Sequence, residues 1–210
     1  MPSARNALIC SVTIIEPNSA AMPEPTRPAS ISAVSTGPSS LIIDALTSLP
    51  NRVLLRDRVI QSLAAATRAG TRLALLFLDL DRFKQINDTL GHHTGDLLLI
   101  EAGRRLRAAV RASDTVARLG GDEFVILLEK IADPQHVTAI VRKLHDLFQH
   151  AMQIGGHELL VHASMGVSIF PRDGKDADEL IQNADQAMYN SKKEGRNTFS
   201  FHSANPEGTG

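Results

Sequence analysis

Residues 116–127 read VARLGGDEFVIL, in which two short apolar runs enclose two glycines and two adjacent carboxylates. Gly120 and Gly121 permit the positive φ angles of a tight hairpin turn and leave room for another backbone to approach. The flanking segments, 115–119 and 123–128, have the length and composition of short strands. The stretch therefore predicts a β-hairpin that carries Asp122 and Glu123 at its tip.

The rest of the chain predicts alternating strands and helices. Residues 72–80, RLALLFLDL, form a continuous apolar run typical of a strand that is covered on both faces. Apolar residues at helical spacing, bounded by caps such as Asn51 and Gly91, predict helices at 53–66, 81–91, 95–112, 134–150 and 176–193. Two further strands are expected at 159–170 and 197–201.

This order of elements predicts an α/β fold, an α+β sandwich with a ferredoxin-like antiparallel central sheet flanked by helices. In that topology the strand 72–80 lies antiparallel to the second strand of the hairpin. Asp79, at the end of the first strand, is then expected beside Asp122 and Glu123. Because side chains alternate along a strand, Asp81 is expected on the same face as Asp79 if the strand continues to it.

Converging carboxylates repel one another unless a cation lies among them. Oxygen ligands with open coordination positions suit Mg²⁺ or Mn²⁺, and Mg²⁺ is usually held by one or two carboxylates together with substrate phosphates. The pattern therefore indicates a metal-dependent nucleotide site. A plain Gly-Gly hairpin with solvated acids at its tip remains the alternative.

The bulk properties limit the classes of function. The chain has 210 residues, a formal net charge of −1 and one cysteine, which argue against a DNA- or RNA-binding protein and exclude an internal disulfide. No apolar run approaches the roughly 20 residues that span a membrane, and the apolar stretch near the start is short and interrupted. We expect a cytoplasmic protein with a disordered tail or linker at 1–40, one folded domain at 41–202 and a flexible tail at 203–210.

Three motifs in order, LDLDRFKQINDTLGHHTGD (78–96), RLGGDEF (118–124) and ADQAMYNSKKEGRN (184–197), resemble the GGDEF-domain diguanylate cyclases. The resemblance runs from about Asp44 to Phe201. It implies a nucleotidyl-cyclase-type sheet and an enzyme that condenses two GTP molecules into cyclic di-GMP with release of pyrophosphate. In the family, two domains meet head to head, so a transient homodimer is implied.

The resemblance also implies roles for individual residues. Asp79, Asp122 and the backbone carbonyl of Leu80 would bind Mg²⁺ (or Mn²⁺), and Glu123 would deprotonate the 3′-hydroxyl or bind a second metal ion. Asp122 and Glu123 are thus the expected catalytic residues. The residues expected to bind GTP are Asn87 and Asp96 at the guanine edge, and Phe83, Lys84, Lys192 and Arg196 around the phosphates. Ordinary helix-end positions are the alternative reading for these polar residues.

The segment RASD, residues 111–114, precedes the hairpin at the spacing of the family's inhibitory site. By resemblance, Arg111 and Asp114 would bind the product cyclic di-GMP, and Arg142 on the following helix would add a second arginine. A helix end followed by a turn is the alternative, since Arg-x-x-Asp is a common pattern.

Two features depart from the family. Ser48 stands in the turn LTSLPNR where the family usually has glycine, which puts the local φ in doubt. No sensor domain and no heptad repeat that would dimerise the chain can be recognised. The intact acidic signature favours an active cyclase over a catalytically silent receptor for GTP or cyclic di-GMP, and a purely structural module would leave the clustered acids unexplained.

Overall fold

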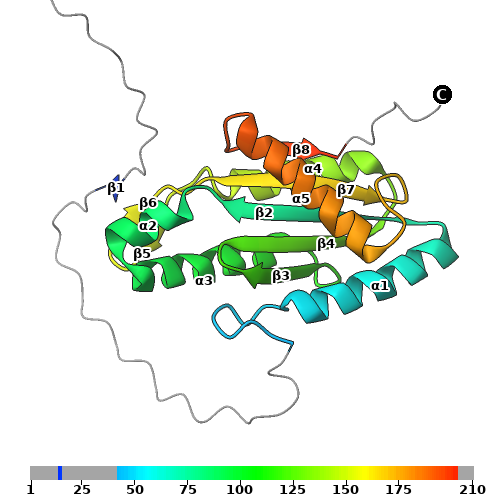
Figure 1. The fold of residues 1–210 in the computed structure, drawn as a ribbon, viewed down its shortest axis with the longest axis horizontal. Helices are drawn as coiled ribbons and strands as arrows, with labels where there is room; N and C mark the ends of the chain where they lie inside the picture. Colours follow the sequence, from blue (N-terminus) through cyan, green and yellow to red (C-terminus); the bar gives the residue numbers. More distant parts are fainter. Residues whose placement is uncertain (1–13, 16–41, 203–210) are drawn as a thin grey trace, which may run out of the picture.

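The computed structural model describes residues 14–15 and 42–202, so the predicted tails at 1–40 and 203–210 lie almost entirely outside the described residues. A five-stranded sheet in the order β3-β4-β2-β7-β8 forms the centre of the molecule (Figure 1). Its strands are β2 (Arg72–Leu80), β3 (Thr115–Gly120), β4 (Glu123–Ile131), β7 (Ala163–Phe170) and β8 (Phe199–Phe201). The helices are α1 (Arg52–Ala69), α2 (Phe83–Leu90), α3 (His92–Ala109), α4 (Pro134–Asp146) and α5 (Ala177–Lys193).

The strands β3, β4, β2 and β7 pair antiparallel, as the ferredoxin-like prediction requires. The predicted antiparallel central sheet is confirmed for these four strands. At one edge β8 pairs parallel with β7, so the whole sheet is mixed. The reason is the helix between them. The 17-residue helix α5 returns the chain along the length of the sheet, so that β8 starts at the same end as β7.

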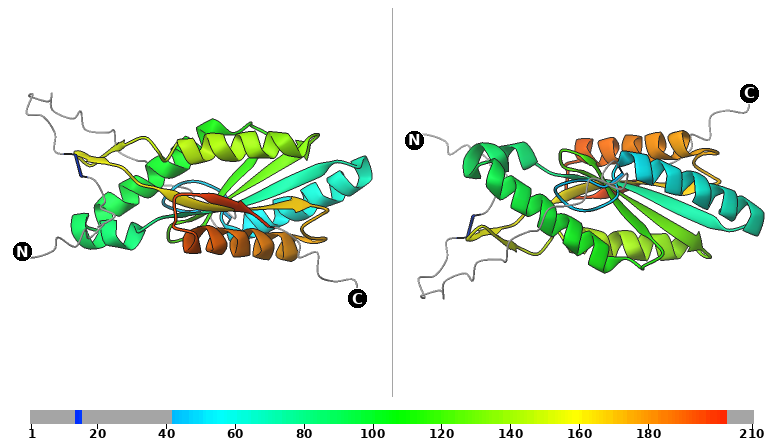
Figure 2. Two further views of the ribbon diagram at one scale, coloured as in Figure 1. Left: turned by 90° about the horizontal axis from the view of Figure 1, so that it is seen from above. Right: turned by 90° about the horizontal axis from the view of Figure 1, so that it is seen from below.

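The two faces of the sheet bury separate apolar clusters, and α1 and α5 cover one face while α3 and α4 cover the other (Figure 2). Along β2 the side chains alternate between these clusters, as they must in a strand buried on both faces. Leu73, Leu75 and Phe77 pack toward α1 and α5, whereas the even-numbered residues from Ala74 to Leu80 pack toward α3 and α4. Asp79 follows Leu73, Leu75 and Phe77 in this alternation and therefore lies on the face of the sheet that α1 and α5 cover.

A second, small sheet was not expected. The strand predicted from 159 to 170 starts at the last residue of β6 (His157–Leu159) and includes all of β7. The strand β6 forms a hairpin with β5 (Met152–Ile154). Gly155 and Gly156, at φ +57° and +86°, make its turn. The short strand β1 (Ile14–Ile15) pairs with β6. None of the helices in the described ranges is long and apolar enough to cross a bilayer.

The turn that precedes α1 is tied to the tip of the β3–β4 hairpin through one arginine. Asp44 accepts hydrogen bonds from the backbone N and the hydroxyl of Thr47, and both of its oxygens lie 3.0 Å from Nη1 of Arg118. Arg118 also donates to the carbonyl of Gly121, at 2.7 and 3.0 Å. Asn51 caps α1 as predicted, since its side chain accepts from the backbone N–H groups of Val53 and Leu54.

Within this turn Ser48 adopts φ +58°, a left-handed conformation that disfavours residues with a Cβ atom. We predict that Ser48→Gly stabilises the protein by about 0.5–1 kcal/mol, because glycine adopts this conformation without steric cost. Ala45→Gly, in the same turn but at an ordinary φ, should be destabilising. Urea unfolding of both variants checks this. Destabilisation by both glycines would show that Ser48 carries no conformational strain.

Candidate active site

The ends of β2 and β4 bring the predicted acids together. In the ladder Asp79 lies directly opposite Glu123, and the amide of Leu80 donates to the carbonyl of Asp122 at 3.3 Å. Residues directly opposite in an antiparallel pair project from the same face. The convergence predicted from the topology is therefore confirmed for these strands, which are adjacent in Figure 1.

Asp79 is a buried carboxylate paired with a cation. It is 9% exposed, and its Oδ2 lies 2.7 Å from Nζ of Lys192, on the last turn of α5. Burial raises the pKa of Asp79 to about 6, with smaller contributions from the neighbouring charges of Asp122 and Asp81, and Lys192 opposes this rise. Asp79 thus already binds a positively charged group, the ammonium of Lys192. A carboxylate that binds a metal ion must likewise accept a cation at its oxygens.

Glu123 faces a different neighbourhood on the same side of the sheet. It lines a cavity of about 410 Å³ between α1 and α5, together with Arg52 and Asp185. Burial is the main reason that its pKa is raised. The charges of Asp185 and Asp122 add to this rise, while Arg52 and Lys192 oppose it. A carboxylate with a raised pKa is a better proton acceptor than an ordinary glutamate.

Among the residues that the structure describes, no three acidic, histidine or cysteine side chains come close enough to enclose a metal ion by themselves. The donor set is one or two carboxylates and the backbone near Leu80, all of them hard oxygen ligands. Such a set fits Mg²⁺ or Mn²⁺ that takes its remaining ligands from substrate phosphates and water, and it does not fit a preformed all-protein metal cage.

The expected guanine-binding residues lie on α2 and α3. The Oδ1 atom of Asn87 is buried and has no hydrogen-bond partner, and a Cβ atom placed on Gly95 would come within 1.9 Å of it. Gly95 therefore makes room for the amide of Asn87, a role that the sequence did not reveal. Asp96 and Lys84 are exposed, whereas the side chain of Phe83 is buried in the core, so only its backbone is available to a ligand.

Arg196 lies in the turn that follows α5, near the end of β2. Its Nε lies 4.0 Å from Oδ1 of Asp81. Asp81 does not continue the row of Asp79 as expected, because β2 ends at Leu80. Instead, its carboxylate accepts from the hydroxyl of Ser164 at 2.8 Å and from the backbone N of Asn197 at 2.9 Å. Asp81 thus connects the acid-bearing strand to the turn that carries Arg196.

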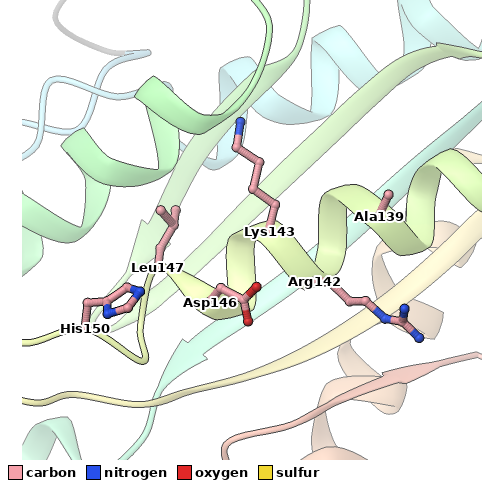
Figure 3. Close-up of a pocket in the computed structure, with 6 residues that line it drawn as sticks. All are labelled: Ala139, Arg142, Lys143, Asp146, Leu147 and His150. Atoms are coloured by element: carbon pink, nitrogen blue, oxygen red, sulfur yellow. The ribbon is translucent and has the colours of Figure 1, made fainter.

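The predicted inhibitory residues are separated from these acids. Asp114 is buried, and its two oxygens accept from the backbone N–H groups of Arg111 and Glu129, at 3.1 and 3.2 Å. The side chain of Arg111 is exposed. Arg142 lines a separate hollow of about 470 Å³ on α4, shown in Figure 3.

One hydrogen bond connects a residue of that hollow to the end of α3. Lys143, which also lines the hollow, donates from Nζ to the carbonyl of Ala109 at 2.8 Å, just before the RASD segment begins. The structure therefore places Arg142 on the helix that is attached to the end of α3.

Several residues around the acids carried no predicted role. Ser164 stands in no recognisable motif, and Asn197 and Asp185 lie within the motif 184–197 but carried no expected role. Each lies far along the chain from the acid that it contacts or influences. Their roles depend on contacts across the sheet, which periodicity and local spacing cannot predict.

Comparison with known proteins identifies the family. Residues 41–198 match the model described as diguanylate cyclase, GGDEF domain. The chain is 51% identical over 158 residues, 75% of its length, to the bifunctional diguanylate cyclase/cyclic di-GMP phosphodiesterase MucR of Pseudomonas aeruginosa, and it spans 23% of that protein.

Solved structures agree. The GGDEF domain of TpbB from P. aeruginosa superposes with a TM-score of 0.76 at 36% identity, covering 78% of this chain and 95% of that one. A microbial GGDEF domain studied for its interaction with cyclic di-GMP superposes with a TM-score of 0.67 at 31% identity, covering 77% and 97%. With the acids of β2 and β4 placed as described, these matches show that the chain belongs to the GGDEF-domain diguanylate cyclase family.

Proposed function

We propose that this chain is an active diguanylate cyclase domain, which condenses two GTP molecules into cyclic di-GMP and two pyrophosphates. The observation that carries the proposal is the pairing of Asp79 opposite Glu123, with Asp122 at the adjoining hairpin tip. Each 3′-oxygen forms a bond to the α-phosphorus of the other GTP, and the bond from that phosphorus to the bridging oxygen breaks. Two chains, each holding one GTP, meet head to head as a transient homodimer.

In this proposal Asp79, Asp122 and the carbonyl of Leu80 hold Mg²⁺ or Mn²⁺. When bound, the metal ion lowers the pKa of the attacking hydroxyl and stabilises the charge that develops on the phosphates. Glu123 accepts the proton of the 3′-hydroxyl, a role that its raised pKa supports. Arg52, on the same face, opposes the rise in the pKa of Glu123.

The phosphates are bound by the cations around β2 and by the first turn of α2. Lys192 and Arg196 donate to phosphate oxygens from the end of α5 and from the following turn. Lys84 adds a charge from α2, and Phe83 contributes its backbone amide, since its side chain is buried.

Guanine recognition is assigned to Asn87 and Asp96. A carboxylate accepts from N1–H and the 2-amino group of guanine, which adenine does not offer in the same arrangement. The buried, unpartnered Oδ1 of Asn87 supports this assignment, because a donor from the base would satisfy it. GTP should therefore be preferred over ATP.

We further propose that cyclic di-GMP inhibits the enzyme at Arg111 and Asp114, with Arg142 as an additional contact. The exposed guanidinium of Arg111 and the cationic hollow on α4 support this assignment. The backbone hydrogen bonds of Asp114 leave each of its oxygens with a further lone pair that can accept from guanine.

The first prediction concerns Glu123→Gln, which keeps the size of the side chain and removes its basicity. Turnover of GTP should fall by a factor of about 10² to 10⁴, as expected for the loss of a general base, while GTP and cyclic di-GMP still bind. Chromatographic detection of cyclic di-GMP and pyrophosphate measures this in nucleotide-stripped protein. An unchanged rate would remove Glu123 from the chemistry. A wild type that binds cyclic di-GMP but makes none would favour the silent receptor.

A second prediction concerns magnesium and pH. The pKa of Asp79 is raised to about 6, so below that pH the folded protein carries a neutral carboxyl group that cannot bind a cation. The half-saturating Mg²⁺ concentration for turnover should rise about tenfold per unit as the pH falls below 6, and should be nearly constant above 7. Circular dichroism over the same range controls for unfolding. A constant magnesium requirement from pH 7 to 5 would contradict the role of Asp79.

A third prediction concerns product inhibition. Arg111→Ala removes an exposed side chain and keeps the backbone N–H that binds Asp114. The concentration of cyclic di-GMP that halves the rate should rise about tenfold or more, because a guanidinium contact to a phosphate or base is lost. The rate without added product should not change. Inhibition as strong as in the wild type would refute the inhibitory-site assignment.

A further inference from the structure

The turn that carries Arg196 has an unfavourable backbone conformation. Arg196 and Asn197 adopt φ +65° and +49°, in the left-handed region, and neither is glycine. Each such residue costs about 1 kcal/mol or more relative to an ordinary conformation. Two of them in succession persist only where contacts with other parts of the molecule hold the turn in place.

The backbone N of Arg196 donates to the carbonyl of Ser191 at 3.1 Å. The contacts made by Asn197 come from two sides. From β2, Asp81 accepts the backbone N–H of Asn197 at 2.9 Å. From the other side, the amides of Gln149 and Asn197 bind reciprocally, with N···O distances of 2.6 and 3.2 Å. His145 approaches the carbonyl of Asn197 with Nε2 at 3.0 Å, and since a carbonyl only accepts, this nitrogen carries the proton.

Gln149 and His145 lie outside the substrate site. His145 is on α4 and Gln149 follows its C-terminal end, whereas the turn follows α5. The same stretch of chain carries Asp146 and His150, which line the hollow in Figure 3. Both Gln149 and Asn197 are half-buried, so their amide pair is shielded in part from competing water.

We propose that Gln149, through its amide pair with Asn197, is a positioning residue that holds Arg196 in place for the triphosphate of the substrate. His145 supports the same turn from α4. The proposal rests on the proposed function, because Arg196 is assigned there to the phosphates. It adds that residues at the end of α4, which touch no substrate, set the productive geometry of the phosphate-binding turn.

The test removes the amide pair from either side. Gln149→Leu deletes the amide at similar volume. Asn197→Gly deletes the partner amide, keeps the backbone atoms that bind Asp81 and His145, and suits the positive φ. Each should lower kcat/KM for GTP by about tenfold, as expected when a charged contact is misplaced by a fraction of an ångström. The double variant should be no worse than the single ones, because the pair acts as a unit.

Repeating the Gln149→Leu substitution in a protein that lacks the Arg196 side chain distinguishes a positioning role from a general loss of stability. If Gln149 acts through Arg196, then Gln149→Leu should have no further effect on kcat/KM in an Arg196→Ala protein. Gln135→Leu, on the exposed first turn of α4, is the matched control and should leave turnover unchanged. An equal loss in both backgrounds, or an unchanged kcat/KM in Gln149→Leu, would overturn the proposal.

Direct binding keeps this test distinct from that of the proposed function. A fluorescent GTP analogue and the corresponding GMP analogue are titrated into each protein. The variants should bind the GTP analogue about tenfold more weakly and the GMP analogue as the wild type does, since the missing contact is to the outer phosphates. A wild type that binds GTP but makes no product would refute the cyclase activity only. Equal weakening for both analogues would refute the positioning role.

Discussion

The antiparallel pairing of β2 with β4, in the register that sets Asp79 opposite Glu123, is the constraint on which the site depends. Apolar clusters on both faces of the sheet fix this register, because a shift by one residue would turn every buried side chain of β2 to the wrong face. The same register places Asp122 at the hairpin tip. Arg118 then ties that tip to the turn before α1 through Gly121 and Asp44. The position of the acids is thus fixed by packing that lies outside the site.

Burial of several carboxylates close together is electrostatically unfavourable. Neighbouring cations reduce this cost but do not remove it. Lys192 forms an ion pair with Asp79, and the charge of Arg52 lowers the pKa of Glu123. The pKa values of both carboxyl groups are nevertheless raised, because burial has the larger effect. Groups with such perturbed pKa values are concentrated at functional sites. The cationic turn beyond α5 is likewise held by contacts from β2 and α4.

The sequence predicts the parts of this molecule that depend on local pattern. The apolar run of β2, the Gly-Gly hairpin, the Asn51 cap and the convergence of Asp79 with Glu123 follow from periodicity, turn chemistry and topology. The hairpin β5–β6 was missed because its strands are three residues long, and the parallel β8 because pairing direction depends on where α5 returns the chain. The Gln149–Asn197 pair joins residues 48 positions apart. No local pattern marks such a contact. The position of Asp81 was also not predictable, because β2 ends at Leu80 and the side chain of Asp81 binds Ser164 and Asn197 instead.

Binding of Mn²⁺ is the most direct test of the claim that this register makes a metal-dependent GTP site. Nucleotide-stripped protein is titrated with Mn²⁺ in the presence of a non-hydrolysable GTP analogue, and free Mn²⁺ is followed by electron paramagnetic resonance. The account predicts that binding requires the analogue, because the residues at 14–15 and 42–202 supply too few ligands by themselves, and that Asp79→Asn abolishes it. Equal binding by wild type and Asp79→Asn would contradict the assignment of β2 and β4 as the metal site.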